Sequence, residues 1–156
     1  MNLGELFTKD VVTAAPSEAI SEVADKMAKR HVGTVVITDK QTPVGIVTDR
    51  DIALAVAARS VSRKDPVSRI MTFPVTTINH KEGILSATRL MRADATRRLP
   101  IVDDERRVIG LVSVDDLLVL LGIEIGNLTE AIAPEVEAAV VHRRRPAAAA
   151  VYNSGE

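Results

Sequence analysis

The sequence predicts an α/β (α+β) fold built from two tandem repeats, and two observations lead to this prediction. First, the chain matches itself: a shift of 64 residues lays Thr8 on Thr72 and Met27 on Met91, and a shift of 65 lays Gly45 on Gly110. Second, each copy alternates short β-branched runs with stretches of helical periodicity. At 156 residues with 46% hydrophobic residues, the chain is large enough for one compact core.

The first copy reads as β-α-β-β-α. A short extended piece at 11–13 precedes an amphipathic helix, for which Ser17 is the expected N-cap. A hairpin follows, with strands at 34–38 and 44–48 joined by a turn at 39–43, and a helix at 49–59 closes the copy. The residues expected to form the buried stripe of the first helix are Ile20, Val23, Ala24, Met27 and Ala28.

The second copy repeats this order and sets the expected boundaries. Its extended piece lies at 75–78, its hairpin strands at 99–102 and 108–113, and its last helix runs from Val114 to about Glu124. We therefore expect a first repeat at 1–59, a polar linker at 60–71, a second repeat at 72–124, and a C-terminal helix extension with a polar tail at 125–156. The arginines at 143–145 read as a solvated charge run without an assigned function.

The helix that closes the second copy carries an unbroken apolar run, Leu117 to Leu121. A helix that is apolar nearly all round must bury this surface somewhere. We expect the last helices of both copies to form a homodimer interface, and the alternative is that they are internal to one chain.

Composition excludes several classes of protein. The formal net charge is −1 and the aromatic residues are Phe7, Phe73 and Tyr152, so the stacking platforms and basic grooves of nucleic-acid-binding proteins are absent. The chain has no cysteine, which excludes disulfides and thiol chemistry. It contains neither a basic start followed by an apolar run nor 18 uninterrupted apolar residues, so we expect a cytoplasmic protein without a membrane segment.

The candidate binding residues lie where the last strand of each copy meets its last helix. Gly45 to Asp51 and Gly110 to Asp116 share the form G-h-h-[ST]-x-x-D, in which h is an aliphatic residue. The hydroxyls of Thr48 and Ser113 would lie beside free N–H groups of a helix N-terminus, which favour an anion such as phosphate. Asp51 and Asp116 could each accept hydrogen bonds from the two hydroxyls of a ribose. The alternative interpretation is an ordinary helix cap, which the second copy of the motif makes less attractive.

These two motifs make residues 6–124 resemble the cystathionine β-synthase (CBS) domain pair, or Bateman module. Phe7-Thr8, Met71-Thr72 and the segment Arg98 to Asp103 add to the resemblance. It implies two β-α-β-β-α units with pseudo-two-fold symmetry, packed through their sheets with helices on the outer face. It also implies clefts that hold AMP, ADP, ATP or S-adenosylmethionine as regulatory ligands, with no cofactor required.

In that family each cleft is composite, and this carries over residue by residue. Cleft one would join Thr48 and Asp51 of the first copy to Thr72, Val75, Arg97 and Arg98, with Arg50 as a further phosphate partner. Cleft two would join Ser113 and Asp116 of the second copy to Thr8, Val11, Val32 and Gly33. On these charges we expect cleft one to prefer phosphate-bearing ligands, and cleft two to prefer adenosine-like or cationic ligands or to stay empty.

We expect binding without chemistry, and therefore no enzyme. His31, His80 and His142 stand alone, without the spacing of a metal site or a catalytic dyad, so no catalytic or metal-binding residue is assigned. The expected function is a stand-alone regulatory or sensor module with an adenosyl ligand, a homodimeric partner and a regulated protein still to be identified. The main alternative is a ligand-free scaffold for dimerisation or docking, and nucleic-acid binding through the arginine tail is disfavoured.

Overall fold

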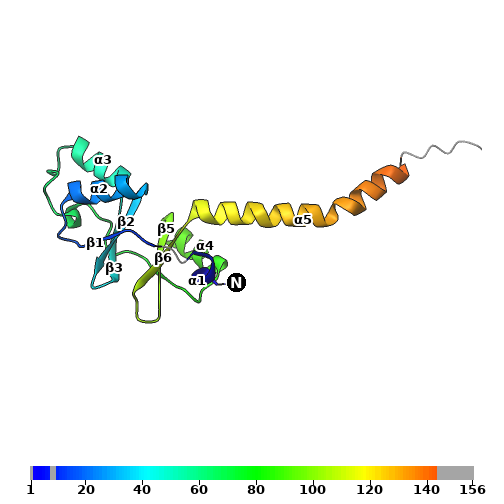
Figure 1. The fold of residues 1–156 in the computed structure, drawn as a ribbon, viewed down its shortest axis with the longest axis horizontal. Helices are drawn as coiled ribbons and strands as arrows, with labels where there is room; N and C mark the ends of the chain where they lie inside the picture. Colours follow the sequence, from blue (N-terminus) through cyan, green and yellow to red (C-terminus); the bar gives the residue numbers. More distant parts are fainter. Residues whose placement is uncertain (1, 8–9, 144–156) are drawn as a thin grey trace, which may run out of the picture. The chain divides into compact units, whose positions relative to one another are not determined.

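A computed structural model describes residues 2–7 and 10–143, with side chains to 134. It divides into two compact units, residues 1–117 and 118–156, which we describe separately. In the first unit, a three-stranded sheet contains β1 (Thr13–Ala14), β2 (Thr34–Asp39) and β3 (Thr42–Thr48) in that order. The second sheet contains β4 (Ile78–Asn79), β5 (Arg98–Val102) and β6 (Val108–Ser113), also in chain order (Figure 1).

The two sheets have the same topology, as the internal repeat predicts. In each, the first strand pairs in parallel with the second, and the second pairs antiparallel with the third. The registers also correspond, because Thr34 lies opposite Thr48 and Arg98 lies opposite Ser113. Both pairings contain an irregularity near the hairpin end, at Ile37/Thr38 and Ile101/Val102. The predicted β-α-β-β-α order is therefore confirmed in both copies.

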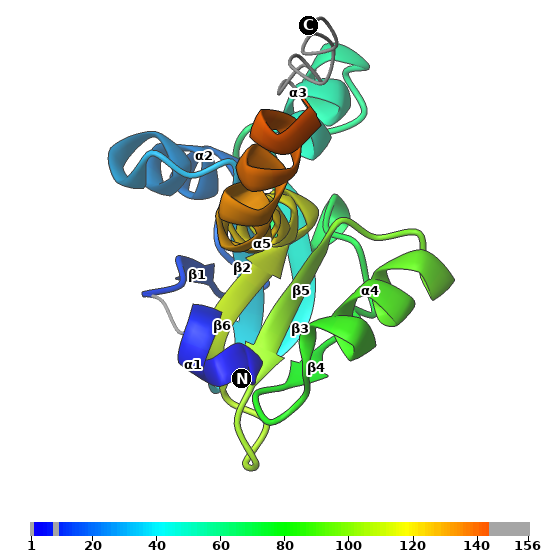
Figure 2. The ribbon, with the colours of Figure 1, turned by 90° about the vertical axis from the view of Figure 1, so that its right-hand side faces the viewer.

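Helices α2 (Ile20–Arg30) and α3 (Asp49–Ala57) lie next to each other beside the first sheet, and α4 (Ile84–Ala93) contacts β5 (Figures 1 and 2). The first core forms because apolar side chains from α2, both strands of the hairpin and the inter-repeat segment meet there. Its buried members are Ala14, Val23, Met27, Val35, Ile37, Val47 and Val67. Of the stripe expected on α2, Ala28 is exposed, because it lies at the edge of the helix face.

The segment that precedes each repeat packs on the sheet of the other repeat. Helix α1 (Leu3–Phe7), which the sequence analysis did not predict, contacts β6 and β5. The backbone N–H groups of Leu3 and Gly4 donate to the carbonyls of Glu82 and His80. In the same way, Thr72 forms two backbone hydrogen bonds with Ile46 of β3, at 2.9 and 3.2 Å. This exchange joins the two repeats into one unit.

Several element boundaries differ from those expected. Ser17 is not the N-cap of α2: the helix begins at Ile20, and the carboxylate of Glu22 accepts from the N–H of Ala19. The opening strands come later than expected, at 13–14 and 78–79, because only these residues pair with the neighbouring strand. The turn of the first hairpin is tighter, since Lys40 and Gln41 take positive φ values and β3 already begins at Thr42. Helix α3 ends at Ala57, before the left-handed Arg59.

The inter-repeat segment is polar in composition, but part of it is buried against the first repeat. A 3-10 helix, η1 (Val67–Arg69), lies within the expected linker, and Val67 is completely buried in the first core. The N–H of Val67 donates to the carbonyl of Glu18 at 2.8 Å, and the N–H of Ile20 donates to Asp65. This part of the linker therefore belongs to the packed fold.

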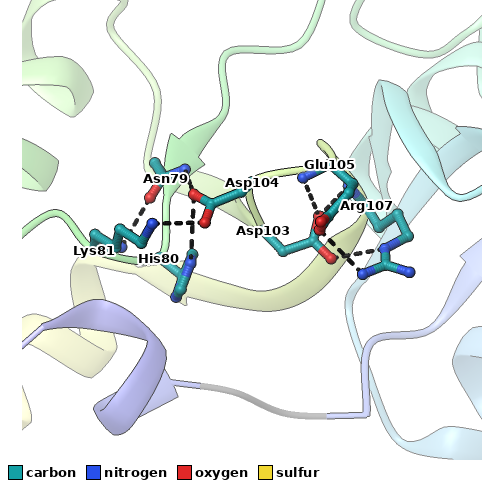
Figure 3. Close-up of polar contacts among 7 residues, drawn as sticks. All are labelled: Asn79, His80, Lys81, Asp103, Asp104, Glu105 and Arg107. Atoms are coloured by element: carbon teal, nitrogen blue, oxygen red, sulfur yellow. Dashed lines mark hydrogen bonds and ion pairs between the residues drawn. The ribbon is translucent and has the colours of Figure 1, made fainter.

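A polar network ties the second hairpin to the turn after β4 (Figure 3). Asp104 accepts from Asn79 and Lys81, and Asp103 accepts from the backbone and guanidinium of Arg107, each at 2.7 Å. Partial burial alone would raise the pKa of Asp103, but the hydrogen bonds and charge of Arg107 outweigh it and hold that pKa below its usual value. The hydrogen bonds and charge of Lys81, together with Asn79, also lower the pKa of Asp104.

Helix α5 (Val114–Arg143) begins in the first unit and forms the described part of the second. It extends well beyond Glu124, where the sequence analysis ended the last helix. Within 118–134 its large apolar side chains are exposed, including Leu118, Ile125 and Leu128. The stretch Val114–Pro134 has the length and mean hydropathy, 1.5, of a membrane span, a property that it shares with helices that pack against protein. Residues 144–156, with most of the arginine tail, lie outside the described residues.

Candidate functional site

The two G-h-h-[ST]-x-x-D motifs form the same hydrogen-bonded arrangement at the N-termini of α3 and α5. Oδ2 of Asp51 accepts from the N–H and Oγ1 of Thr48 at 2.8 and 2.7 Å, and the N–H of Asp51 donates back to Oγ1. Oδ2 of Asp116 accepts from the N–H and Oγ of Ser113 at 2.9 and 2.6 Å, with the same return bond. Each motif is thus a capping box, the alternative that the sequence left open.

The capping box does not use the whole carboxylate. A carboxylate has about four lone-pair positions, and the bonds from the capping residue go to Oδ2. Oδ1 of Asp51 accepts no hydrogen bond among the described residues. All four residues of the two boxes are half-buried, so they are fixed in place and still reachable from solvent. The cap orients both carboxylates, and in Asp51 it leaves Oδ1 available to a ligand.

The glycine of each motif admits the crossing segment of the other repeat. A Cβ on Gly110 would lie 2.5 Å from the carbonyl oxygen of Phe7, and a Cβ on Gly45 would lie 2.5 Å from Sδ of Met71. Real Cβ atoms do not approach other atoms so closely, so Gly110 is needed for the contact with the Phe7 backbone, and a side chain at position 45 would require Met71 to move. The opening residues of one repeat are thereby held beside the hydroxyl and carboxylate of the other.

A cavity of about 270 Å³ lies at the Ser113–Asp116 motif and corresponds to cleft two. It is composite: the segment before β1 and the turn between α2 and β2 contribute from the first repeat, and β5, β6 and the start of α5 contribute from the second. Apolar side chains line most of it, with a few polar groups, as is typical of small-molecule sites. The lining residues are Asp10, Val11, Val12, Val32, Gly33, Thr34, Arg98, Leu111, Ser113 and Asp116.

This cavity brings together Val11, Val32, Gly33, Ser113 and Asp116, which the resemblance assigned to cleft two. Thr8, the remaining residue of that set, lies outside the described residues.

Sequence reasoning placed Thr34 at cleft two beside Gly33 and missed Asp10, Val12 and Leu111. Leu111 could have been found, because it lies two residues before Ser113 and alternate residues of a strand share a face. Asp10 and Val12 flank Val11 in the same extended segment. Thr34, 7% exposed, lies opposite Thr48 in the register of the first hairpin.

The structure corrects the assignment of Arg98 to cleft one. Arg98 lines the cavity of cleft two, because it pairs with Ser113 in the antiparallel register of β5 and β6. Its neighbour Arg97 is exposed, and its Nη2 lies 3.2 Å from Oδ1 of Asp115. The carbonyl of Arg97 accepts from the N–H of Val114, so this residue is anchored at the start of α5. Cleft two therefore contains one cation, Arg98, that the sequence analysis had assigned to cleft one.

The other residues assigned to cleft one are distributed around the start of α3. Thr72 is held at β3 by its backbone hydrogen bonds to Ile46, and Val75 is half-buried. Arg50 is exposed in the first turn of α3, where its N–H donates to the side chain of Asp49. Among the described residues, no group of three or more His, Asp or Glu side chains could hold a metal ion.

Known proteins resemble this chain over about three quarters of its length. It is 38% identical over 120 residues to an uncharacterized protein of Methanopyrus kandleri, covering 76% of this chain and 61% of that protein. It is 34% identical over 115 residues to the CBS domain-containing protein YhcV of Bacillus subtilis, covering 74% and 81%. It also matches 22% of the inosine-5'-monophosphate dehydrogenase of Methanocaldococcus jannaschii, at 32% identity and over 73% of this chain.

Solved structures give the same result. A CBS domain pair in complex with 5'-methylthioadenosine and S-adenosyl-L-methionine has a TM-score of 0.71 and 30% identity, covering 80% of this chain and 98% of that one. A CBS domain protein from Pyrobaculum aerophilum, complexed with AMP, has a TM-score of 0.70 and 28% identity, covering 80% and 99%. The family model for the CBS domain matches residues 3–58 and again 67–122. The chain therefore belongs to the CBS domain family and carries two copies of the domain.

Proposed function

We propose that this chain is a regulatory module that binds an adenosyl ligand in cleft two without transforming it. The observation that carries the proposal is the composite cavity in which Ser113 and Asp116 of one repeat face Val11 and Gly33 of the other. Structural neighbours with this fold are complexed with AMP, or with 5'-methylthioadenosine and S-adenosyl-L-methionine.

In the proposed complex, Asp116 accepts hydrogen bonds from the ribose hydroxyls while Ser113 continues to orient its carboxylate. The apolar side chains of Val11, Val12 and Leu111 offer a surface for the flat adenine ring. The N-terminus of α5 and Arg98 provide donors for a phosphate. Cleft one, with Thr48 and Asp51 in the same geometry, is a second candidate site for the same class of ligand.

A ligand screen with a matched pair of variants tests the proposal. Adenosine, AMP, ADP, ATP, 5'-methylthioadenosine and S-adenosylmethionine are compared by thermal shift and titration calorimetry. A ligand at 100 times its Kd should stabilise the protein by about 2.7 kcal/mol. Asn at position 116 can still cap the helix but presents an NH₂ group to the ribose, so Asp116→Asn should weaken binding by roughly tenfold or more. Asp51→Asn makes the same change in the other repeat; it should leave binding to cleft two unchanged and weaken only a binding step that belongs to cleft one.

No stabilisation by any of these ligands would contradict the proposal and favour the alternative, a scaffold for dimerisation or docking. A specific observation supports a dimer in either case. The exposed residues Leu118, Leu121, Ile125, Leu128 and Ile132 of α5 follow each other at intervals of three and four. This heptad spacing puts Leu118, Ile125 and Ile132 at one core position and Leu121 and Leu128 at the other. Ile paired with Leu in this way is typical of two-stranded parallel coiled coils. We therefore propose a homodimer in which α5 pairs with α5 of a second copy, in a cytoplasmic protein that acts on a partner still to be identified.

A further inference from the structure

A groove of about 400 Å³ lies between the edge of the first sheet and helix α2. Strand β1 and α2 stand next to each other in both views of the chain (Figures 1 and 2). The groove contains no residue of the Ser113–Asp116 motif and is separate from cleft two, with which it shares only the segment 11–12. Its lining residues are Val11, Val12, Thr13, Lys26, Lys29 and Arg30.

Strand β1 is an edge strand whose second side pairs with no other strand of the described sheet. On its first side, the N–H of Val36 in β2 donates to the carbonyl of Val12 at 3.1 Å. Successive residues of a strand direct their backbone groups to opposite sides, so the backbone of Thr13 faces away from β2. Nζ of Lys26 donates to the Thr13 carbonyl at 3.0 Å, and the Thr13 N–H has no acceptor among the described residues. The free edge of β1 therefore opens into the groove.

The opposite wall of the groove is basic. Its three cations occupy positions i, i+3 and i+4 of α2 and share one face of the helix. Nζ of Lys26 lies 2.6 Å from Oε2 of Glu18, and Arg30 is paired with Asp10. Lys29 is exposed and makes no hydrogen bond or ion pair with the described residues. The pair of Arg30 with Asp10 is also exposed and such pairs contribute little to stability, so a carboxylate from outside can replace Asp10.

These cations make the free edge selective. Lysine at an exposed edge protects a sheet against pairing with an ordinary strand, and Lys26 has this position beside Thr13. A strand with Asp or Glu at every second position brings carboxylates to the cations, because its alternate side chains lie on one face. Asp25 lies one turn before Lys29 but is not among the described residues that line the groove.

The repeated fold does not require this basic wall. The shift of 64 residues replaces the three cations of α2, in order, with Leu90, Ala93 and Asp94. Helix α4 forms without them and has only Arg92 as a basic residue in its last turn, so compensation of the helix dipole does not need three. Asp94 instead accepts from Oγ1 of Thr76 at 2.6 Å. The basic groove belongs to the first repeat alone.

We propose that this groove binds an acidic, extended segment of another protein, which adds to the free edge of β1 and places its carboxylates against Lys29 and Arg30. In this mode of recognition the backbone at the sheet edge supplies affinity, and alternate side chains supply specificity. The inference goes beyond the proposed function, because it names a contact surface and a chemistry for a protein partner and involves no nucleotide.

Fluorescence anisotropy with two labelled peptides of seven residues tests the proposal on the full chain without nucleotide. The probe alternates Val and Glu, and the control peptide has Gln in place of each Glu. The acidic peptide should bind at least about tenfold more tightly than the Gln peptide at about 50 mM salt, and the difference should shrink at about 500 mM because salt screens the charges.

Two variants with matched controls locate the site. Lys29→Ala should weaken the acidic peptide by roughly three- to fivefold, and Lys64→Ala, at an exposed place in the inter-repeat segment, should not. Thr13→Pro removes the outward N–H of β1 and leaves the Val12 carbonyl paired with β2, so it should weaken binding by about tenfold or more. Thr77→Pro makes the same change at the matching position of the second repeat and should leave binding unchanged.

Equal affinity for the two peptides, or no binding of either, would overturn the proposal. Binding of the acidic peptide that neither Lys29→Ala nor Thr13→Pro weakens would place it elsewhere, for example on the arginines at 143–145, and would also overturn it. Circular dichroism checks that each variant is folded. The exposed Lys29→Ala variant keeps the test decisive if Thr13→Pro unfolds. None of these results bears on ligand binding at Asp116, so the two proposals stand or fall separately.

Discussion

At the scale of single residues, the Ser/Thr–Asp pair forms a helix cap in both repeats. The same bonds hold the Asp116 carboxylate at the edge of the composite cavity, where we propose that it also binds a ribose. Removing the carboxylate with Ala would therefore cost about 0.5 to 2 kcal/mol of stability through the lost cap, in addition to any ligand contact. Asn is the better probe, since it keeps an acceptor for the capping N–H.

The two motif glycines should differ in their tolerance of a methyl group. At Gly110 the added Cβ meets the backbone carbonyl of Phe7, whereas at Gly45 it meets first the flexible thioether of Met71. Backbone cannot yield as a side chain can, so we expect Gly110→Ala to destabilise the protein by about 1–3 kcal/mol. We expect Gly45→Ala to cost less. Urea denaturation of both variants measures the difference, and an equal or reversed order would show that α1 is not held against β6 in this way.

The network in Figure 3 predicts a pH dependence. The pKa of Asp103 is held below its usual value in the folded chain, so its ionised form stabilises the fold above its unfolded pKa, near pH 4. This stabilisation is lost as the pH falls through the lower pKa of the folded state. We expect Asp103→Asn to lower the melting temperature at pH 7 and to have a smaller effect near pH 3. A difference that persists unchanged in acid would exclude the ion pair with Arg107 as its cause.

At the scale of elements, α5 provides the clearest prediction. Its seam residues are between 45% and 68% exposed, although they are large and apolar. We expect a dimer in analytical ultracentrifugation at tens of micromolar, and a shift to monomer in Ile125→Lys, which places a charge at the centre of the seam. Asn127→Lys adds the same charge two residues away on another face of the helix and should leave the dimer intact.

Ultracentrifugation together with vesicle flotation tests the alternative, in which the apolar face of α5 contacts lipid instead of a second copy. A wild-type chain that is monomeric, and that floats with phosphatidylcholine vesicles in a density gradient, would show that the apolar face of α5 meets lipid. Dissociation by both lysine variants alike would mean that the 3–4 spacing does not define the interface.

Local sequence patterns predicted which strands and helices form better than they predicted where each one begins and ends. The repeat and the β-branched runs predicted both hairpins, because strand pairing within a hairpin is local. The N-cap predicted at Ser17 was wrong, because the carboxylate of Glu22 accepts a hydrogen bond from the N–H of Ala19 at the start of the helix. Short-range sequence rules do not rank such competing hydrogen-bond partners. Helix α1 went unpredicted, since five residues form a helix there through contacts with β6 that are distant in sequence.

At the scale of the whole molecule, duplication gives two Ser/Thr–Asp motifs with the same hydrogen bonds and different neighbouring charges. The residues proposed to face a ribose were predicted from the repeated motif alone. The position of Arg98 could not be predicted in this way, because it depends on the register of β5 and β6, in which Arg98 lies opposite Ser113 and so lines cleft two. Side-chain placement across the two repeats is a tertiary property that no window of sequence contains.

The central claim is that Asp116 is the ribose acceptor of an adenosyl ligand in the cavity between the repeats. A crystal structure of the chain grown with saturating ATP, and a second with AMP, tests it most directly. We predict density for the nucleoside against Val11 and Gly33, with both ribose hydroxyls within hydrogen-bonding distance of the Asp116 carboxylate. A nucleotide that binds in solution but lies elsewhere in the crystal, or one whose ribose points away from Asp116, would contradict the account.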